Sequence, residues 1–213
     1  MNRVLKRPMF RKGGSTGGIT SGLRQGYANQ SRVKQNDDWR SKQLGDVFTG
    51  KTTLGEKLYE HFVGLYSKKN VELLDGEKFR QHLDKVYSFS TEDRFEVIKK
   101  IVPVVVDFIQ QNKIVIVSTI SHKRQMRDFS RNRLSNFMEV YLKCPVAVCA
   151  RRDYKGHYRR AYAGEYEMFV GVTEPYEESE SPELVLDTAT QSLDQCSQIL
   201  IDKATQFLNN QNQ

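Results

Sequence analysis

Gly45-Asp46-Val47-Phe48-Thr49-Gly50-Lys51-Thr52 is the segment from which the architecture of the chain is most readily inferred. It satisfies the spacing G-x-x-x-x-G-K-[ST], in which the glycines let the backbone curl so that its N–H groups point at phosphate oxygens. In such a loop Lys51 reaches the β- and γ-phosphates of ATP, and the Thr52 hydroxyl holds Mg²⁺. The candidate nucleotide-binding residues are Gly45, Gly50, Lys51, Thr52 and Thr53.

A helix is expected directly after this loop, from Lys51 to about Tyr66. Its apolar side chains recur on one stripe, at Leu54, Leu58, Phe62 and Leu65. The positive end of that helix would add to the attraction for phosphate. Before the loop, a short strand is expected to end near Leu44–Phe48.

Two features of the loop leave a second interpretation open. The segment 39–43 is too polar for a central strand, and Asp46 would repel a polyphosphate. Phe48 is also unusual at such a position. If residues 47–50 are instead the end of the strand, most of the loop is absent and the ATP site is weak or inactive.

Further strands and helices alternate along the chain. Strands are expected at 71–74, 113–119, 138–142 and 184–186, and helices start near Ser90 and Ser192. Pro103 interrupts the helix expected from about Glu92 to Gln111, where a proline costs about 3 kcal/mol or forces a kink. Strands separated by helices indicate an α/β fold with three layers, a parallel sheet with helices on both faces. Ligands bind such sheets at the carboxyl ends of the strands.

The first 38 residues differ from the rest in composition. They hold eight Lys or Arg and two Asp, a net charge of +6, which leaves +1 for residues 39–213. The segment is rich in Gly, Ser, Asn and Gln and lacks apolar periodicity, so we expect a flexible basic tail ahead of one domain at 39–213. A solvated tail is the simplest interpretation, and an anchor for RNA or another anionic surface is the alternative.

Location can also be anticipated from the sequence. No apolar run approaches the length that crosses a bilayer, and residues 1–10 lack the apolar stretch of a secretory signal. The three cysteines, Cys144, Cys149 and Cys196, cannot all pair and lack metal-ligand spacing. These observations predict a cytoplasmic protein without membrane association.

Several ordered motifs beyond the loop resemble those of the adenylylsulfate kinase family, whose fold is of the P-loop kinase type. The matching stretches are 74–80 (LDGEKFR), 89–94 (FSTEDR), 120–121 (IS), 152–158 (RDYKGHY), 163–165 (AGE), 169–171 (FVG), 175–177 (PYE) and 182–188 (PELVLDT). They follow the family's order and spacing over about residues 44–208. The resemblance implies transfer of the γ-phosphate of ATP to the 3′-hydroxyl of adenylyl sulfate, with Mg²⁺ as cofactor and a homodimer as the working state.

The resemblance also implies roles for single residues at the centre of the reaction. Asp75 would lie near Mg²⁺ and the attacking hydroxyl, and would either take its proton or position it. Lys51, Asp75 and Ser121 would thus be the catalytic residues, with Thr52 and Asp75 at the metal. Read by itself, the Asp75-Gly76 pair is more often only a turn.

Other implied roles concern the two nucleotides. Arg80 and Arg94 would bind the phosphosulfate of the acceptor, although Arg94 alone could be a solvated residue of its helix. Ile120 and Ser121 would contact the acceptor.

The remaining roles belong to the region around a lid. Phe169 would stack on the acceptor base, although beside Met168 it could equally be a core residue. Arg152 would lie against the adenine of ATP. Lys155 would belong to a lid reaching to Tyr176, which excludes water from the site.

Departures from the family motifs keep two alternatives open. Val97 replaces an asparagine, Lys99-Lys100 replaces two arginines, and His122-Lys123 replaces Pro-Tyr. The first alternative is a kinase of another nucleotide conjugate, as in the cytidine diphosphoramidate kinases. The second is a catalytically silent relative that binds RNA or a protein through its basic tail.

Overall fold

The computed structural model describes residues 49–153 and 155–211. The chain divides into two units, 1–35 and 36–213, and the described residues all belong to the second. The expected tail, the strand expected at 44–48 and the first part of the phosphate loop lie outside the described residues.

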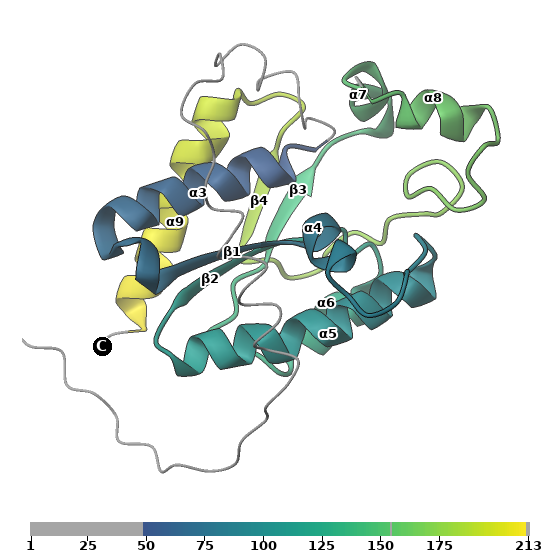
Figure 1. The fold of residues 1–213 in the computed structure, drawn as a ribbon. Helices are drawn as coiled ribbons and strands as arrows, with labels where there is room; N and C mark the ends of the chain where they lie inside the picture. Colours follow the sequence, from purple (N-terminus) through teal and green to yellow (C-terminus); the bar gives the residue numbers. More distant parts are fainter. Residues whose placement is uncertain (1–48, 154, 212–213) are drawn as a thin grey trace, which may run out of the picture. The chain divides into compact units, whose positions relative to one another are not determined.

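The described strands form two parallel pairs (Figure 1). β1 (Val71–Asp75) pairs with β2 (Ile114–Ser118) in the register Val71↔Ile114 to Asp75↔Ser118. β3 (Val140–Lys143) pairs with β4 (Leu184–Asp187) from Val140↔Leu184 to Lys143↔Asp187. The prediction of parallel strands is therefore confirmed, although β3 begins two residues later than expected.

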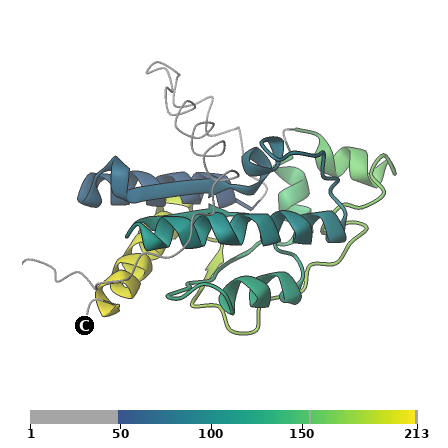
Figure 2. The ribbon, with the colours of Figure 1, turned by 60° about the horizontal axis from the view of Figure 1, so that its bottom comes forward.

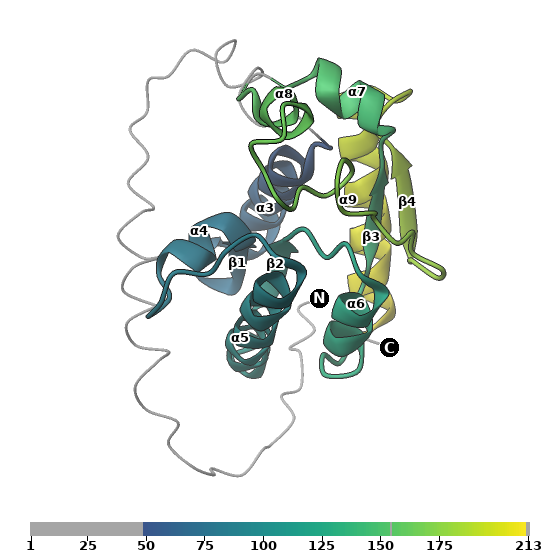
Figure 3. The same cartoon turned by 90° about the vertical axis from the view of Figure 1, so that its right-hand side faces the viewer.

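Helices α3 (Lys51–Tyr66) and α9 (Leu193–Asn210) pack on one side of the strands (Figures 1 and 3). One hydrophobic cluster joins them to all four strands; among its members are Leu54, Phe62, Val71, Ile116, Leu142, Leu186 and Leu200. Ser192 begins α9 with a capping box, because its hydroxyl accepts from the Gln195 N–H and the Gln195 side chain accepts from the Ser192 N–H. The stripe predicted on α3 is wrong at Leu65, whose side chain is 59% exposed.

Helices α5 (Thr91–Gln110) and α6 (Arg124–Arg131) lie on the opposite side, which Figure 2 brings forward. Ile98, Val102 and Met126 form the buried contact between the two helices. Ser90 caps α5 by accepting the Asp93 N–H at 3.2 Å, as its sequence predicted. α5 continues through Pro103, so the expected interruption is wrong.

Short helices occupy the carboxyl ends of the strands. α4 (Gly76–Gln81) follows β1 directly, and α7 (Val146–Arg151) and α8 (His157–Tyr162) follow β3. The 3₁₀ turn η1 (Lys68–Asn70) precedes β1 at the other end. Figure 1 shows the first residues of α3 and α5 at the same end of the strands as α4 and α8. Within the described ranges, no helix is both long and apolar enough to span a bilayer.

Candidate active site

The described part of the phosphate loop ends in a left-handed glycine. Gly50 has φ 87° and precedes the first residue of α3, and its carbonyl accepts the Leu54 N–H at 2.9 Å. A residue with a side chain would be strained in this conformation. Lys51, Thr52 and Thr53 form the first turn of α3, whose backbone N–H groups have no partner within the helix. Gly45 lies outside the described residues.

The Thr52 and Asp75 side chains meet where α3 begins and β1 ends. The Thr52 hydroxyl donates to Asp75 Oδ2 at 3.1 Å. Asp75 Oδ1 accepts the N–H groups of Glu77 at 2.9 Å and Lys78 at 3.1 Å, which makes Asp75 the N-cap of α4. The Asp-Gly pair is thus more than a turn, because its carboxylate is held by one helix and faces the first turn of another.

Two glycines allow this close approach. A Cβ added at Gly55 of α3 would lie 2.5 Å from Ser118 Oγ, and one added at Gly76 would lie 2.7 Å from Thr119 Cγ2. The Ser118 hydroxyl also donates to the Lys51 carbonyl at 3.4 Å. The ends of β1 and β2 are therefore packed directly against the helix that follows the phosphate loop.

These residues fit a magnesium ion that is bound together with a nucleotide. The described residues contain no group of three His, Cys, Asp or Glu that could hold a metal by themselves. Mg²⁺ usually takes only one or two protein oxygens, and phosphates and water supply the rest. The Thr52 hydroxyl and the Asp75 carboxylate are two such oxygens, and they are already in contact.

Two arginines share an aromatic ring beside α4. The guanidinium carbons of Arg80 and Arg94 lie 4.7 Å and 5.3 Å from the centre of the Phe89 ring, which is 55% exposed. Arg80 donates to the carbonyls of Tyr87 and Ser88, and Arg94 Nε donates to the Phe89 carbonyl at 2.9 Å. No ion pair in the described part of the chain includes either arginine.

The electrostatics of this pair favour an anion. Burial, and then the charge of Arg80, lower the pKa of Arg94 to about 10. Burial also lowers the pKa of Arg80, although Asp93 and Glu77 oppose that effect. Arg80 Nε is buried without a hydrogen-bond partner among the described residues. Two partly buried guanidinium groups that repel one another would be stabilised by a doubly charged oxyanion.

Ser121 lies in the loop that leaves β2. Its hydroxyl is 3.1 Å from Thr119 Oγ1, and its carbonyl accepts Arg127 Nη1 at 2.7 Å. Ile120 beside it is 38% exposed. This loop follows β2 at the strand end that also carries Asp75, since Asp75 and Ser118 are partners in the register.

Arg152, Lys155 and Phe169 belong to the region around α7 and α8. Arg152 is the C-cap of α7; its Nη2 donates to the Thr188 carbonyl at 2.9 Å, and its Nη1 lies 3.9 Å from Cys144 Sγ. Lys155 is exposed just before α8. The Phe169 ring stacks on Tyr166 at 5.6 Å and meets the edge of Tyr158 at 4.9 Å.

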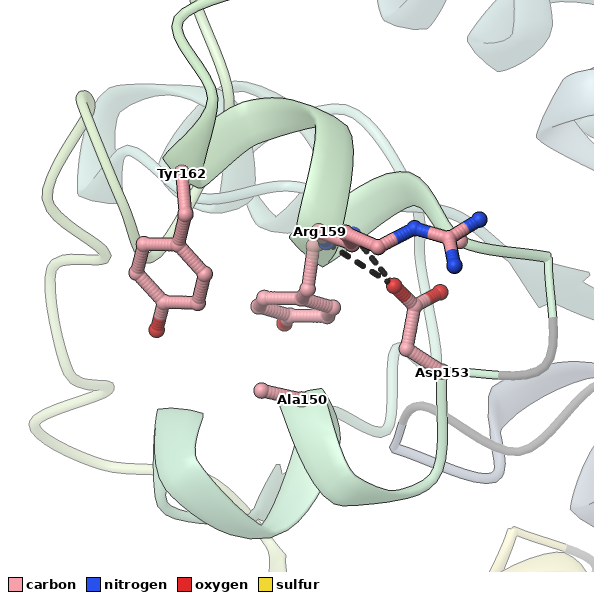
Figure 4. Close-up of a pocket in the computed structure, with 6 residues that line it drawn as sticks. Ala150, Asp153, Arg159 and Tyr162 are labelled. Carbon is pink, nitrogen blue, oxygen red and sulfur yellow. Dashed lines mark hydrogen bonds between the residues drawn. The ribbon is translucent and has the colours of Figure 1, made fainter.

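A cavity of about 500 Å³ lies between α7 and α8 (Figure 4). Its lining residues are Ala150, Asp153, Gly156, Tyr158, Arg159 and Tyr162. The Asp153 carboxylate accepts the N–H groups of His157, Tyr158 and Arg159 at 2.9, 2.6 and 3.2 Å. The negative charge of Asp153 therefore lies at the start of α8. Arg152 is not among the described residues that line this cavity.

The structure shows two details of the site that the sequence analysis did not predict. Phe89 lies between Arg80 and Arg94, and only its position inside a family motif pointed to it. Val97, which had suggested a different acceptor, is 3% exposed and belongs to the buried side of α5. It fills the core, so its lack of a polar group says little about the acceptor.

Comparisons with known proteins agree with these features. Residues 44–187 match the family model described as adenylylsulphate kinase. An adenylyl-sulfate kinase of Synechococcus sp. (strain JA-3-3Ab) is 41% identical over 152 residues, which are 71% of this chain and 85% of the relative. One of Bacillus licheniformis is 38% identical over 178 residues, 82% of this chain and 87% of the relative. Among solved structures, the Mycobacterium tuberculosis APS kinase in complex with AMPPNP and APS has a TM-score of 0.68 and 29% identity, and covers 74% of this chain and 91% of its own.

Proposed function

The chain belongs to the adenylylsulphate kinase family, and we propose that the residues described above carry out its reaction. That reaction moves the γ-phosphate of ATP to the 3′-hydroxyl of adenylyl sulfate and gives 3′-phosphoadenylyl sulfate and ADP. The enzyme is thus an ATP-dependent kinase. The contact between the Thr52 hydroxyl and Asp75 Oδ2, at 3.1 Å, carries the assignment of the reaction centre, because it joins the phosphate loop to the end of β1.

Lys51, Thr52 and Asp75 would act on the transferred phosphate. Lys51 would pair with the β- and γ-phosphates, while Thr52 and Asp75 would hold Mg²⁺. When bound, Mg²⁺ neutralises charge on the phosphates. Asp75 Oδ1 is engaged by two N–H groups of α4, and Oδ2, which accepts the Thr52 hydroxyl, is the oxygen that faces the phosphate loop. Asp75 would either take the proton of the 3′-hydroxyl or position that hydroxyl. Gly45, Gly50 and Thr53 would complete the phosphate site with their backbone N–H groups.

The acceptor would bind across the ends of β1 and β2. Arg80 and Arg94 would take its phosphosulfate, since the two guanidinium groups lie around one ring and neither is in an ion pair with another described residue. Ile120 and Ser121 would line its other side. Phe169 would contact the base with the part of its ring that Tyr166 and Tyr158 leave uncovered.

Arg152 and Lys155 would serve the ATP side and the lid. The Thr188 carbonyl fixes the Arg152 guanidinium, and a fixed planar group is suited to stacking on adenine. Lys155 would approach the phosphates when the lid closes.

We also propose a cytosolic homodimer. Cys144, Cys149 and Cys196 form no disulfide bond with one another, which suits a reducing compartment. Association occurs among the structural neighbours, since one is a hexameric APS kinase from Thiobacillus denitrificans with a TM-score of 0.55 and 25% identity. It covers 76% of this chain and 27% of its own. Analytical ultracentrifugation of the full chain would test the dimer.

Turnover measurements would test the reaction and its residues together. Purified protein with ATP, Mg²⁺ and adenylyl sulfate should form ADP and 3′-phosphoadenylyl sulfate in equal amounts. Lys51→Ala and Asp75→Asn should each lower kcat about 100- to 1000-fold. The first removes the positive charge that pairs with the phosphates, and the second removes the carboxylate that serves Mg²⁺ and the 3′-hydroxyl. Lys69→Ala, in η1 at the end of β1 opposite Asp75, and Asp202→Asn, in α9, are matched controls that should keep the wild-type rate.

Other outcomes would redirect the proposal. ATP binding without turnover of adenylyl sulfate, but with turnover of a cytidine diphosphate conjugate, would establish the alternative acceptor. A chain that does not bind ATP at all would have an inactive phosphate loop. Full activity in Lys51→Ala or Asp75→Asn would refute the roles given to those residues.

A further inference from the structure

His122 is a fully buried imidazole beside the proposed acceptor site. It follows Ser121, precedes α6 and has 0% of its surface exposed. Its Nε2 lies 2.9 Å from the Thr91 hydroxyl, which belongs to the first residue of α5. Its Nδ1 has no hydrogen-bond partner among the described residues.

The backbone of His122 and the side chain of Lys123 hold a second segment. The Glu177 N–H donates to the His122 carbonyl at 2.8 Å. Lys123 Nζ lies 2.5 Å from Glu174 Oε1 and 3.6 Å from Glu177 Oε1. His122 Nε2 itself is 3.8 Å from Glu174 Oε1. Residues 122–123 therefore contact α5 on one side and residues 174–177 on the other.

Both attached segments lead directly to acceptor residues. Thr91 lies in the same first turn of α5 as Arg94, whose N–H donates to the Ser90 carbonyl at 2.9 Å. Glu174 closes the turn that begins at Phe169, because its N–H donates to the Phe169 carbonyl at 3.2 Å. His122 is thus the buried link between the segment that carries Arg94 and the segment that carries Phe169.

Arg127 fixes the same place from the α6 side. It is 8% exposed, and it donates to the Ser121 carbonyl and to the Glu177 carbonyl, each at 2.7 Å. The backbone around His122 is therefore held independently of the imidazole. A change of the imidazole should then affect the link to Thr91 without displacing the loop.

Packing alone does not explain a histidine at this position. An apolar side chain would fill the space without leaving a buried nitrogen unpaired, and an unpaired buried nitrogen is unfavourable. Burial, with Arg94 and Lys123 nearby, also keeps the ring neutral, since its pKa is lowered to about 4. A neutral ring can accept or donate at Nε2 without adding a charge between Arg94 and Glu174.

We propose that His122 is a positioning residue for the acceptor nucleotide. It holds the first turn of α5, which carries Arg94, in a fixed position relative to residues 169–177, which carry Phe169. This inference rests on the acceptor site proposed above. His122 acts through Thr91 and the 174–177 segment and is not expected to touch the substrate.

Steady-state kinetics of four variants would test the link. His122→Leu removes the imidazole of the contact, and Thr91→Val removes its hydroxyl. Each variant should raise the KM for adenylyl sulfate about tenfold, while the KM for ATP stays within about twofold of wild type. His122→Gln keeps a polar group near the position of Nε2, and Thr91→Ser keeps the hydroxyl. Both conservative variants should stay close to wild type.

Hydrogen exchange of the full chain gives a readout that does not depend on turnover. In Thr91→Val the amides of 91–97 should exchange faster than in wild type, whereas Thr91→Ser should leave them unchanged. Unchanged exchange of 91–97 in Thr91→Val, or equal rises in the two KM values, would overturn the inference. A wild-type chain without adenylyl sulfate turnover would instead refute the proposed acceptor, and the exchange data would still decide whether His122 links the two segments.

Discussion

At the scale of single residues, Gly55 sets the distance between α3 and the end of β2. A Cβ there would lie 2.5 Å from Ser118 Oγ, closer than packed atoms allow. Gly55→Ala should therefore lower the free energy of unfolding by about 1–3 kcal/mol, as overpacking of a tight contact does. Gly64 is a matched control in the same helix with nothing within 4 Å, and Gly64→Ala should raise the free energy of unfolding by about 0.5–1 kcal/mol.

Urea denaturation of both variants would measure these changes. The added variant Gly55→Ala with Ser118→Ala should recover part of the loss, because the obstructing oxygen is gone. Equal stability of Gly55→Ala and Gly64→Ala would show that α3 can move away from β2 without cost.

The His122 imidazole gives stability a dependence on pH. Burial first, and then Arg94 and Lys123, lower its pKa from 6.5 to about 4, against the opposing effect of Glu174 and Glu177. On acidification His122 is therefore protonated near pH 6.5 in the unfolded chain but only near pH 4 in the folded chain. The resulting stability is complete above pH 6.5 and is lost as the pH falls through this window.

His122→Leu should remove this part of the pH dependence. Urea midpoints measured for both proteins between pH 4 and 7 should fall more steeply with falling pH in wild type, since only wild type carries the titrating group. Parallel curves for wild type and His122→Leu would mean that the imidazole takes up its proton at the same pH in the folded and the unfolded chain.

At the scale of elements, α5 shows how a helix tolerates an internal proline. Pro103 lies on the exposed side of α5, between the buried residues Val102 and Val104. The carbonyl that Pro103 leaves without a partner can therefore bind water, and the buried side of the helix still packs on β2 and α6. Packing of that buried side outweighs the local cost.

Pro103→Ala should accordingly stabilise the protein. The gain in the free energy of unfolding is expected to be about 1–3 kcal/mol, because a helical hydrogen bond is restored and a steric conflict is removed. Chemical denaturation of Pro103→Ala beside Gln110→Ala, an exposed position near the end of the same helix, would measure it. A loss of stability in Pro103→Ala would indicate that the proline acts mainly by restricting the unfolded chain.

The long elements could be predicted because their periodicity is strong. α3, α5 and α9 carry apolar stripes, and α5 and α9 also begin at capping serines. β1 and β2 are short, mostly apolar runs followed by turn residues. The short helices gave no such signal. α6 is the clearest case, since its sequence RQMRDFSR has few apolar residues, and it is held by Arg127 and Arg131, which bind residues distant in the chain.

The candidate site was predictable to the extent that it resides in local motifs. The Thr52–Asp75 contact joins a loop motif to a strand end, so the parallel topology placed both residues at one edge. His122 contacts Thr91 and Glu174, which lie 31 and 52 positions away in the chain. A periodic pattern of apolar residues does not predict contacts between positions so far apart. The roles of the site residues, those of Arg152, Lys155 and Phe169 included, remain predictions.

At the scale of the whole molecule, the core extends beyond the segment that matches the family model. The match ends at residue 187, whereas Cys196, Leu200 and Ala204 of α9 belong to the same buried cluster as Leu54 and Phe62 of α3. The last helix is therefore part of the fold.

The basic tail, by contrast, is expected to be dispensable for the reaction. A chain lacking residues 1–38 should keep the kcat and both KM values, because all described site residues follow Thr49. Any affinity of the full chain for RNA should fall steeply with salt and disappear with the tail, since the tail holds a net charge of +6. A drop in kcat on removal of the tail would show that it contributes to the site.

The two arginines around Phe89 also determine which buffers suit this protein. Inorganic sulfate and phosphate are small oxyanions, and either would relieve the repulsion between the guanidinium groups of Arg80 and Arg94. In such a buffer the chain would melt at a higher temperature and would turn over adenylyl sulfate more slowly when that substrate is scarce. The conditions that preserve the protein best in storage would thus be those that hide its affinity for the acceptor.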